Sequence, residues 1–287
     1  MYTKLLKYIK RRKAERDFFP HVALKGRKIK SVPLLCMSGH QEYLRSLKNS
    51  RLGERGIIIA NGPSLKETPL HRLKNEVTIG CNGIYKLFPD LGFPVAYYMT
   101  EDKIQTELRS REIETMSVPL KFAAISNADS FSFHNDINYF QTVSSWTVED
   151  IESQQPVETA FSTNFDQFVV LGGTITYIML QFAYHLGLNP VYLVGLDHSY
   201  GRLSQLYPPG KIEITPENID IVRECHFSEE YYNIGDRIGV PHVALQEAAY
   251  RKARQVYEVA GRKIINVSAE SQLEVFQRDD FSKVFGR

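Results

Sequence analysis

The chain has few cysteines and no pair of them at close spacing. Its three cysteines, Cys36, Cys81 and Cys225, are odd in number and far apart. Structural zinc sites need thiolates or imidazoles at short fixed spacings, and a disulfide framework needs an even set of cysteines. The cysteine content therefore argues against both, and it predicts reduced thiols in a cytoplasmic protein.

Long apolar runs are missing as well. No stretch approaches the about 18 apolar residues that a membrane-spanning helix requires. The first residues are interrupted by lysines and lack the continuous apolar core of a signal peptide. We therefore expect neither a transmembrane span nor a secretory signal.

An excess of one charge sign is also absent from the chain as a whole. The 35 lysines and arginines nearly balance the 33 aspartates and glutamates, so the formal net charge is only +2. This balance argues against a nucleic-acid partner. The exception is residues 1–30, where basic residues alternate with apolar ones. They predict either a basic amphipathic helix on an anionic membrane face or a solvated, frayed helix.

Three nucleotide and hydrolase signatures are missing. No GxxxxGK[ST] loop is present, which disfavours P-loop chemistry. No G-x-S-x-G elbow and no strand-linked G-x-G-x-x-G occurs, which weakens the hydrolase and dehydrogenase interpretations.

What the chain does contain is an alternation of short apolar strands and helices. With 287 residues and 43% hydrophobic content, it can form one large domain. Such alternation predicts an α/β fold, Rossmann-like and doubly wound, with a mainly parallel sheet. The expected strands are Gly56–Ala60, Val77–Cys81, Val95–Met99, Leu120–Ile125, Tyr139–Val143, Val191–Val194 and Lys263–Val267. The expected helices are Lys103–Glu114, Thr174–Leu186 and Val243–Ala260.

The pattern divides the chain into an extension and a catalytic domain. Residues 1–50 are basic and irregular, and we expect a helical extension there. Residues 51–287 carry the domain. Within it, residues 199–240 lose periodicity and are rich in aromatics and prolines, which predicts a folded lid. We refer to residues 199–240 as the lid segment.

The most informative stretch is residues 56–65, Gly-Ile-Ile-Ile-Ala-Asn-Gly-Pro-Ser-Leu. A buried strand enters a tight turn, and Ser64 then begins a segment with helix-starting character. Free amides at a helix N-terminus favour phosphate, and Asn61 adds a side-chain amide. This stretch predicts a nucleotide or another phosphorylated ligand.

Small and polar residues follow several of the predicted strands. Because ligands bind beyond the carboxyl ends of parallel strands, we expect these residues to form one site. They are Asn61, Gly62, Pro63 and Ser64; Asn82; Asp102, beside Glu101; Gly172, Gly173 and Thr174 ahead of a helix; and Gly195, Asp197, His198 and Tyr200. Asp197 and His198 could orient a base or bind a sugar hydroxyl, and Asp102 could hold a metal ion. His226 in the lid segment could serve as a general base after closure.

Each of these residues also has a plain structural interpretation. Asn61 and Asn82 fit turns, and Ser64 fits a helix N-cap. Asp197 could be a hydrogen-bonded structural carboxylate, and His226 could be a surface histidine. The sequence leaves these alternatives open.

Several blocks together resemble one family. Residues 58–65, 73–82, 97–102, 172–177 and 192–199, with weaker C-terminal blocks, are similar to the MptE-like (6-hydroxymethylpterin diphosphokinase-like) family. That family is related to the Maf flagellin-modifying proteins and to the bacterial sialyltransferases that use CMP-sugars. The resemblance extends over roughly residues 50–285 and implies a sialyltransferase-like, GT-A-like version of the fold.

The resemblance also implies roles for single residues. By analogy with the sialyltransferases, Asn61, Gly62, Ser64 and Asn82 would bind the CMP part of a donor, and Gly173 and Thr174 would contact it. Gly195, Asp197, Tyr200 and His226 would correspond to the strand end and the catalytic lid. Ala60 replaces the usual glycine, residues 267–270 depart from the family pattern, and the arginine and paired tyrosines of the sialyltransferases have no clear match.

The leading expectation is a glycosyltransferase-like enzyme that uses a nucleotide donor, CMP-sugar by resemblance, in surface polysaccharide biosynthesis. Its acceptor would be a glycan or a lipid-linked molecule. Residues 1–30 would bring the enzyme to the inner membrane face, where a lipid-linked acceptor lies. One alternative is an ATP-dependent 6-hydroxymethylpterin pyrophosphokinase with magnesium. Another is a non-catalytic nucleotide-binding module. The donor sugar, the metal and homo-oligomer formation stay open.

Overall fold

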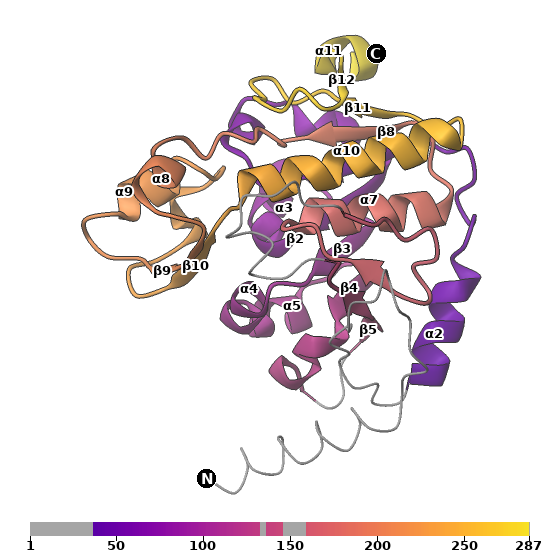
Figure 1. The fold of residues 1–287 in the computed structure, drawn as a ribbon, viewed down its shortest axis with the longest axis horizontal. Coiled ribbons are helices and arrows are strands. Elements are labelled where there is room, and N and C mark those ends of the chain that lie inside the picture. Colours follow the sequence, from indigo (N-terminus) through magenta and orange to yellow (C-terminus); the bar gives the residue numbers. More distant parts are fainter. Residues whose placement is uncertain (1–36, 133–135, 146–158, 287) are drawn as a thin grey trace, which may run out of the picture.

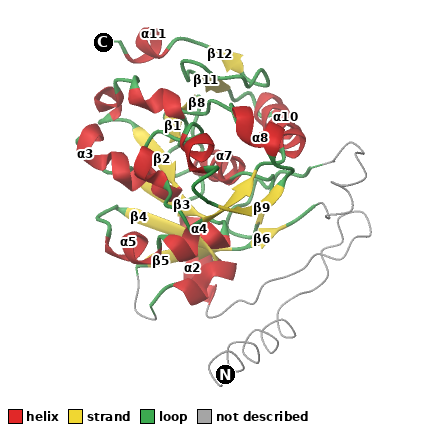
Figure 2. Ribbon diagram, turned by 90° about the vertical axis from the view of Figure 1, so that its left-hand side faces the viewer, coloured by secondary structure: helices red, strands yellow, loops and turns green. Residues whose placement is uncertain are grey.

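A computed structural model describes residues 37–132, 136–145 and 159–286. The basic segment 1–30 lies outside the described residues. The chain forms an eight-stranded sheet in the order β12-β11-β8-β1-β2-β3-β4-β5, and every pair of neighbours is parallel (Figures 1 and 2). The strands are β1 (Gly56–Ile59), β2 (Val77–Cys81), β3 (Tyr97–Thr100), β4 (Leu120–Ala124), β5 (Ile137–Phe140), β8 (Val191–Val194), β11 (Ile264–Asn266) and β12 (Gln277–Arg278). The α/β prediction is confirmed.

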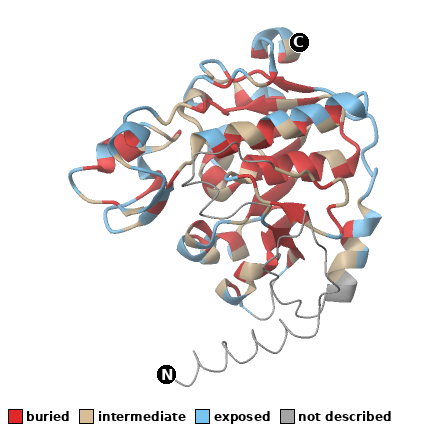
Figure 3. Cartoon of the chain, in the orientation of Figure 1, coloured by how far each residue is buried: buried red, intermediate tan, exposed pale blue. Residues whose placement is uncertain are grey.

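The central strands β1 and β8 are apolar along their whole length because both faces of the sheet are covered there. In β1, Ile57 and Ile59 belong to one core and Ile58 to the other, which follows from the alternation of side chains along a strand. One core lies under the long helices α7 (Ile175–Leu186) and α10 (Val243–Val259). Figure 3 shows the central strands of the sheet and α7 almost entirely buried.

Shorter elements complete the layers. The helices are α2 (Met37–Ser46), α3 (Phe88–Leu91), α4 (Lys103–Leu108), α5 (Ser110–Thr115), α8 (Gly201–Leu206), α9 (Ile219–Arg223) and α11 (Phe281–Phe285). A small parallel pair, β6 (Thr142–Val143) and β7 (Val169–Val170), and an antiparallel pair, β9 (Gly210–Glu213) and β10 (Arg237–Val240), lie outside the main sheet.

Part of the expected extension belongs to the domain. Leu44 on α2 is 1% exposed. Its carbonyl lies 2.8 Å from Nε2 of His185, and Arg45 pairs with Asp166 at 3.3 Å. The boundary predicted at residue 50 is therefore too late, since α2 is docked on the sheet.

Three further expectations need correction. The helix predicted over Lys103–Glu114 is divided at Arg109, which ends α4 and begins α5. The strand predicted over Tyr139–Val143 is shared between β5 and β6. The segment after Gly62 is only a 3-10 turn, Pro63–Lys66, because Pro69 disfavours helical backbone at Thr68.

The lid segment forms several short regular elements. It contains α8, β9, α9, a 3-10 turn at Glu229–Tyr231 and β10 (orange in Figure 1). Figure 1 shows it projecting to one side of the sheet.

Candidate functional site

The order in which strands are added to the sheet reverses between β1 and β8. The loops that follow these two strands meet at this point. Strands β2 to β5 lie on one side of β1, whereas β8, β11 and β12 lie on the other. In doubly wound sheets such a reversal opens a crevice at the carboxyl edge. Asn61 to Ser64 and Gly195 to Asp197 lie at this point, so the structure gathers them as the sequence predicted.

The Asp197 carboxylate occupies the amide-lined turn after β1. Oδ2 accepts the backbone N–H of Ser64 at 2.7 Å, and Oδ1 accepts the Ser64 hydroxyl. A Cβ atom at Gly62 would lie 2.5 Å from Asp197 Oδ2, so only glycine permits this approach. An internal carboxylate thus takes the anion position that the sequence assigned to a phosphate.

Asn61 and Asn82 follow β1 and β2 at the same edge of the sheet. Asn61 Nδ2 donates to the Cys81 carbonyl at 3.3 Å and lies 3.2 Å from its Sγ. Since a carbonyl can only accept, Oδ1 of Asn61 points the other way, and among the described residues it has no hydrogen-bond partner. Asn82 Oδ1 is buried and equally unpartnered within the described chain. The site therefore offers two acceptor oxygens for ligand donors.

His198 and Tyr200 form a second group against α10. The Tyr200 hydroxyl donates to Gln246 Oε1 at 2.8 Å, and Gln246 Nε2 donates to the Gly173 carbonyl at 2.9 Å. His198 is 8% exposed, and its Nε2 lies 3.6 Å from Glu247. Burial lowers the pKa of His198, although Glu247 partly opposes the shift. At neutral pH this imidazole is uncharged.

Thr174 caps α7, and its hydroxyl accepts the N–H of Thr176 at 3.3 Å. The link from Gln246 to the Gly173 carbonyl places the Gly172–Thr174 turn beside Tyr200.

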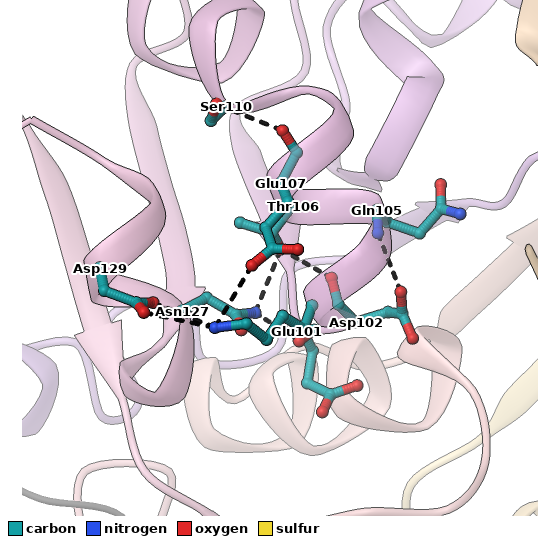
Figure 4. A network of polar contacts seen from close by, with 9 residues as sticks. Glu101, Asp102, Gln105, Thr106, Glu107, Ser110, Asn127 and Asp129 are labelled. Carbon is teal, nitrogen blue, oxygen red and sulfur yellow. Dashed lines mark hydrogen bonds and ion pairs between the residues drawn. The ribbon is translucent and has the colours of Figure 1, made fainter. Parts of the chain in front are cut away.

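The two carboxylates after β3 diverge. Asp102 Oδ1 accepts the Gln105 N–H at 2.9 Å and caps α4, whereas the Glu101 carboxyl points away from that cap (Figure 4). Burial, with the Asp102 charge second, raises the pKa of Glu101 to about 7. No group of three or more metal-binding side chains occurs within the described ranges. The metal role of Asp102 stays a prediction, and no step below depends on it.

The lid histidine lies against two tyrosines. The His226 ring stacks on Tyr231 with a centroid distance of 4.3 Å and meets Tyr232 edge-on at 5.1 Å. Its Nδ1 lies 3.4 Å from the Val222 carbonyl, which assigns the proton to Nδ1 and leaves Nε2 as the basic nitrogen. Burial, opposed by the Val222 carbonyl and aided by the Arg109 charge, lowers the pKa of His226 to about 4.

The His226 region is attached to the loops of the sheet edge. The Phe227 N–H donates to the Asn61 carbonyl at 3.1 Å, and the Gly83 N–H donates to the Tyr231 hydroxyl at 3.0 Å. We call residues 226–232 the docking turn. The turn brings His226 to the Asn61 and Asn82 loops, while His198 and Tyr200 stay in the separate group against α10.

Two features of this edge are not apparent from the sequence. Arg109 is 2% exposed and lies 4.8 Å from the Tyr231 ring centroid, but nothing near it in the sequence indicates burial. Glu101 was noted only beside Asp102. Its position directly after the buried strand β3 is the sequence feature that indicates a carboxyl group with a raised pKa.

The fold and this edge define a doubly wound α/β protein whose polar site lies at the carboxyl ends of the central strands. The family model for 6-hydroxymethylpterin diphosphokinase MptE-like proteins matches residues 35–202, more than half of the 287 residues. The chain belongs to this family, as the sequence blocks predicted.

Comparisons with other known proteins add distant similarities. No curated protein matches the sequence. The Maf glycosyltransferase of Magnetospirillum magneticum AMB-1 is 15% identical with a TM-score of 0.45, over 86% of this chain and 39% of that one. The chain thus spans about two fifths of that protein. A variant of the sialyltransferase CST-II in complex with CMP is 16% identical with a TM-score of 0.40, over 78% of this chain and 85% of that one. Within the described residues, no helix is both long and apolar enough to cross a bilayer.

Proposed function

We propose that the protein is a glycosyltransferase that moves a sugar from a CMP donor to a hydroxyl of a glycan or lipid-linked acceptor. The observation that carries the proposal is the position of His226. The docking turn holds this neutral imidazole at the Asn61 and Asn82 loops. A neutral nitrogen next to a ligand edge can take the proton of an attacking hydroxyl.

The acceptor oxygens at the edge favour the sugar end of a nucleotide. Oδ1 of Asn61 and Oδ1 of Asn82 are buried and need donors. A phosphate at neutral pH supplies almost none, whereas ribose hydroxyls and the cytosine amino group do. We therefore assign these two oxygens to the nucleoside.

The charge of the edge favours a donor with few phosphates. The three residues after each of β1, β2, β3 and β8 include Glu101, Asp102 and Asp197, and their single lysine, Lys103, pairs with Glu107 and Asp129. Two of these carboxyl groups, Asp102 and Asp197, accept backbone N–H groups in the fold. A monophosphate donor meets less repulsion there than a triphosphate would.

The proposed reaction is a direct displacement. The acceptor oxygen attacks the anomeric carbon and forms the new C–O bond. The bond from that carbon to the phosphate oxygen breaks, and CMP leaves with the electron pair. The acceptor proton moves to Nε2 of His226. His198 and Tyr200 would orient the sugar, and the N-terminal amides of α7 beside Thr174 would stabilise the leaving phosphate.

Ligand-induced stabilisation tests the donor class. We expect CMP and CDP to raise the melting temperature more than ATP with magnesium does, because bound ligand stabilises the folded state. The Asn61→Ala variant should lose the CMP effect. A shift with ATP and magnesium but none with cytidine nucleotides would contradict the proposal.

A turnover assay tests the base. We expect His226→Ala to abolish sugar transfer and keep the CMP-induced shift, while His71→Ala, on an exposed histidine, changes neither. If both variants bind CMP and neither they nor the wild type transfers sugar, a non-catalytic module is the better account.

The pH profile separates His226 from Glu101 as the base. With a pKa of about 4, His226 is already unprotonated at pH 6, so the rate should be flat from pH 6 to 8. With a pKa of about 7, Glu101 would give a rate that falls below pH 7. A rate that halves near pH 7 would shift the assignment to Glu101.

The family match favours a second candidate function, pyrophosphoryl transfer from ATP to a hydroxymethylpterin. The reason is that the matching family is named after a 6-hydroxymethylpterin diphosphokinase. That reaction also moves a group from a nucleotide to a hydroxyl, so the same base would serve. Release of AMP from ATP when hydroxymethylpterin and magnesium are added would support it, and the absence of AMP would reject it.

A further inference from the structure

A buried arginine without an acidic partner lies beneath the docking turn. Arg109 is 2% exposed. Its Nη1 donates to Gln105 Oε1 at 2.6 Å, and its Nη2 donates to the Tyr231 carbonyl at 2.9 Å. Among the ion pairs of the described residues, none includes Arg109. Burying such a cation is unfavourable unless its surroundings stabilise the charge.

The surroundings are the faces of two lid tyrosines. The guanidinium carbon lies 4.8 Å from the ring centroid of Tyr231 and 5.2 Å from that of Tyr232. Both distances are in the range of cation–π attraction, which is strongest when water is excluded. Gln105 Nε2 also donates to the Tyr232 hydroxyl at 2.8 Å. Arg109, through its cation–π contacts, and Gln105, through its hydrogen bond to Tyr232, therefore hold the two tyrosines in place.

The other end of Tyr231 meets the loop after β2. Its hydroxyl accepts the Gly83 N–H, and a Cβ atom at Gly83 would lie only 2.5 Å from the ring. On its face, Tyr231 carries the stacked His226 ring at 4.3 Å. One tyrosine thus connects Arg109, the Asn82–Gly83 loop and His226.

We propose that Arg109 is a positioning residue that holds the docking turn, and with it His226, against the loop after β2. The guanidinium joins the end of α4 to the turn, and its contacts add to the hydrogen bonds that Asn61 and Gly83 make with the turn. The link to catalysis rests on the proposed function, but the contacts themselves do not.

The charge of Arg109 has a second effect on His226. The groups that face His226 are the Tyr231 and Tyr232 rings, the Val222 carbonyl and, behind the rings, Arg109. Tyr85 and Tyr98 also interact with the charge of Arg109. Of the groups facing His226, only Arg109 carries a charge at neutral pH. It opposes protonation of the imidazole and so keeps the nitrogen available.

Amide hydrogen exchange and histidine NMR on the full chain test the proposal without any nucleotide. The test variant is Arg109→Met, which keeps the aliphatic stem and removes the charged fork. The matched control is Arg111→Met, two residues on and exposed. The informative amides are those of Gly83 and Phe227, and the β8 amides report the global fold.

We expect Arg109→Met to accelerate exchange at Gly83 and Phe227 about tenfold or more, while β8 stays protected. The His226 titration midpoint should rise from about 4 towards the ordinary 6.5. Arg111→Met should change neither. Unaltered exchange at both amides, or an unmoved midpoint, would overturn the proposal.

A second variant, Arg109→Lys, keeps the test valid if Arg109→Met fails to fold. Arg109→Lys keeps a charge but not the planar fork. It should lose protection at Gly83 and Phe227, and the His226 midpoint should rise less than in Arg109→Met because the positive charge is kept. Full protection in this variant would show that the fork does not hold the turn. Since no nucleotide is present, a failure of the proposed function leaves these outcomes decisive.

Discussion

The two edges of the central sheet are built from the same strands but differ in how their polar groups are satisfied. At the amino edge, the Gly56 N–H donates to Pro190 at 2.9 Å, and the Lys263 N–H donates to Asn189 Oδ1 at 3.0 Å. Arg55 and Glu76 pair there through two contacts. These contacts tie each chain segment to its neighbour.

The carboxyl edge leaves a row of amide oxygens without partners. Asn61 follows β1, Asn82 follows β2, Asn127 follows β4 and Gln141 follows β5, and the side-chain oxygen of each is buried and unpartnered among the described residues. Between them, after β3, lies Glu101 with its raised pKa. Since buried polar groups are normally paired, this edge gives up stability that the amino edge keeps. Such a contrast is typical of an edge that binds a ligand.

The largest effect is expected at Asp197, a carboxylate of this edge that accepts two hydrogen bonds from Ser64. Asp197→Ala leaves the Ser64 N–H and hydroxyl without their acceptor. Because hydrogen bonds to a buried charge are the strong ones, the free energy of unfolding should fall by about 3 kcal/mol. Urea unfolding measures it. A loss below 1 kcal/mol would mean that the turn after β1 does not depend on Asp197.

Glu101→Gln should stabilise the protein in a pH-dependent way. The folded-state pKa, about 7, exceeds the ordinary 4.5. Folding therefore favours the protonated form, and its contribution is complete below pH 4.5 and lost as the pH rises through 7. The variant should gain about 2 kcal/mol over wild type at pH 8 and almost nothing at pH 4. Equal unfolding curves at pH 8 would contradict the burial of this carboxyl.

Asn82 separates backbone strain from ligand binding. Its φ is 50°, a left-handed conformation that asparagine tolerates and alanine does not. Asn82→Ala should cost about 1 kcal/mol more than Asn82→Gly in chemical unfolding. Both variants should lose the CMP-induced stabilisation. If Asn82→Gly retains it, the Asn82 side chain is not a ligand contact.

The smallest effect is expected at the amino edge. Glu76→Gln removes the ion pair with Arg55, whose side chain is 45% exposed. Because exposed pairs are screened by water, the loss should stay below about 1 kcal/mol at any pH from 6 to 8. A larger loss would remove the contrast between the two edges.

The sequence was sufficient for the strands that fill both cores. Runs such as Ile57–Ile59 are apolar throughout, and only burial on both faces explains them. The two-residue strand β12 was missed because both of its residues are exposed and carry no apolar signal. The loss of periodicity over residues 199–240 indicates a lid segment. It does not indicate that β9 and β10 pair as a hairpin within that segment.

The site was predictable where it depends on strand ends and not where it depends on distant pairing. Asn61, Asn82 and Asp197 follow from the rule that ligands meet the carboxyl edge. That Asp197 would fill the anion position of Ser64 depends on a contact 133 residues apart, which no local pattern encodes. Arg109 reads as a surface residue of a helix, and its partner Tyr231 lies 122 residues away.

A crystal structure of the protein grown with CMP tests the central claim most directly. We predict the nucleotide at the carboxyl edge, with ribose or cytosine hydrogens donated to Oδ1 of Asn61 and Oδ1 of Asn82, and with the phosphate at the N-terminal amides of α7 beside Thr174. A CMP molecule bound elsewhere, for instance in the surface groove between Arg254 and Gln272, would contradict the account.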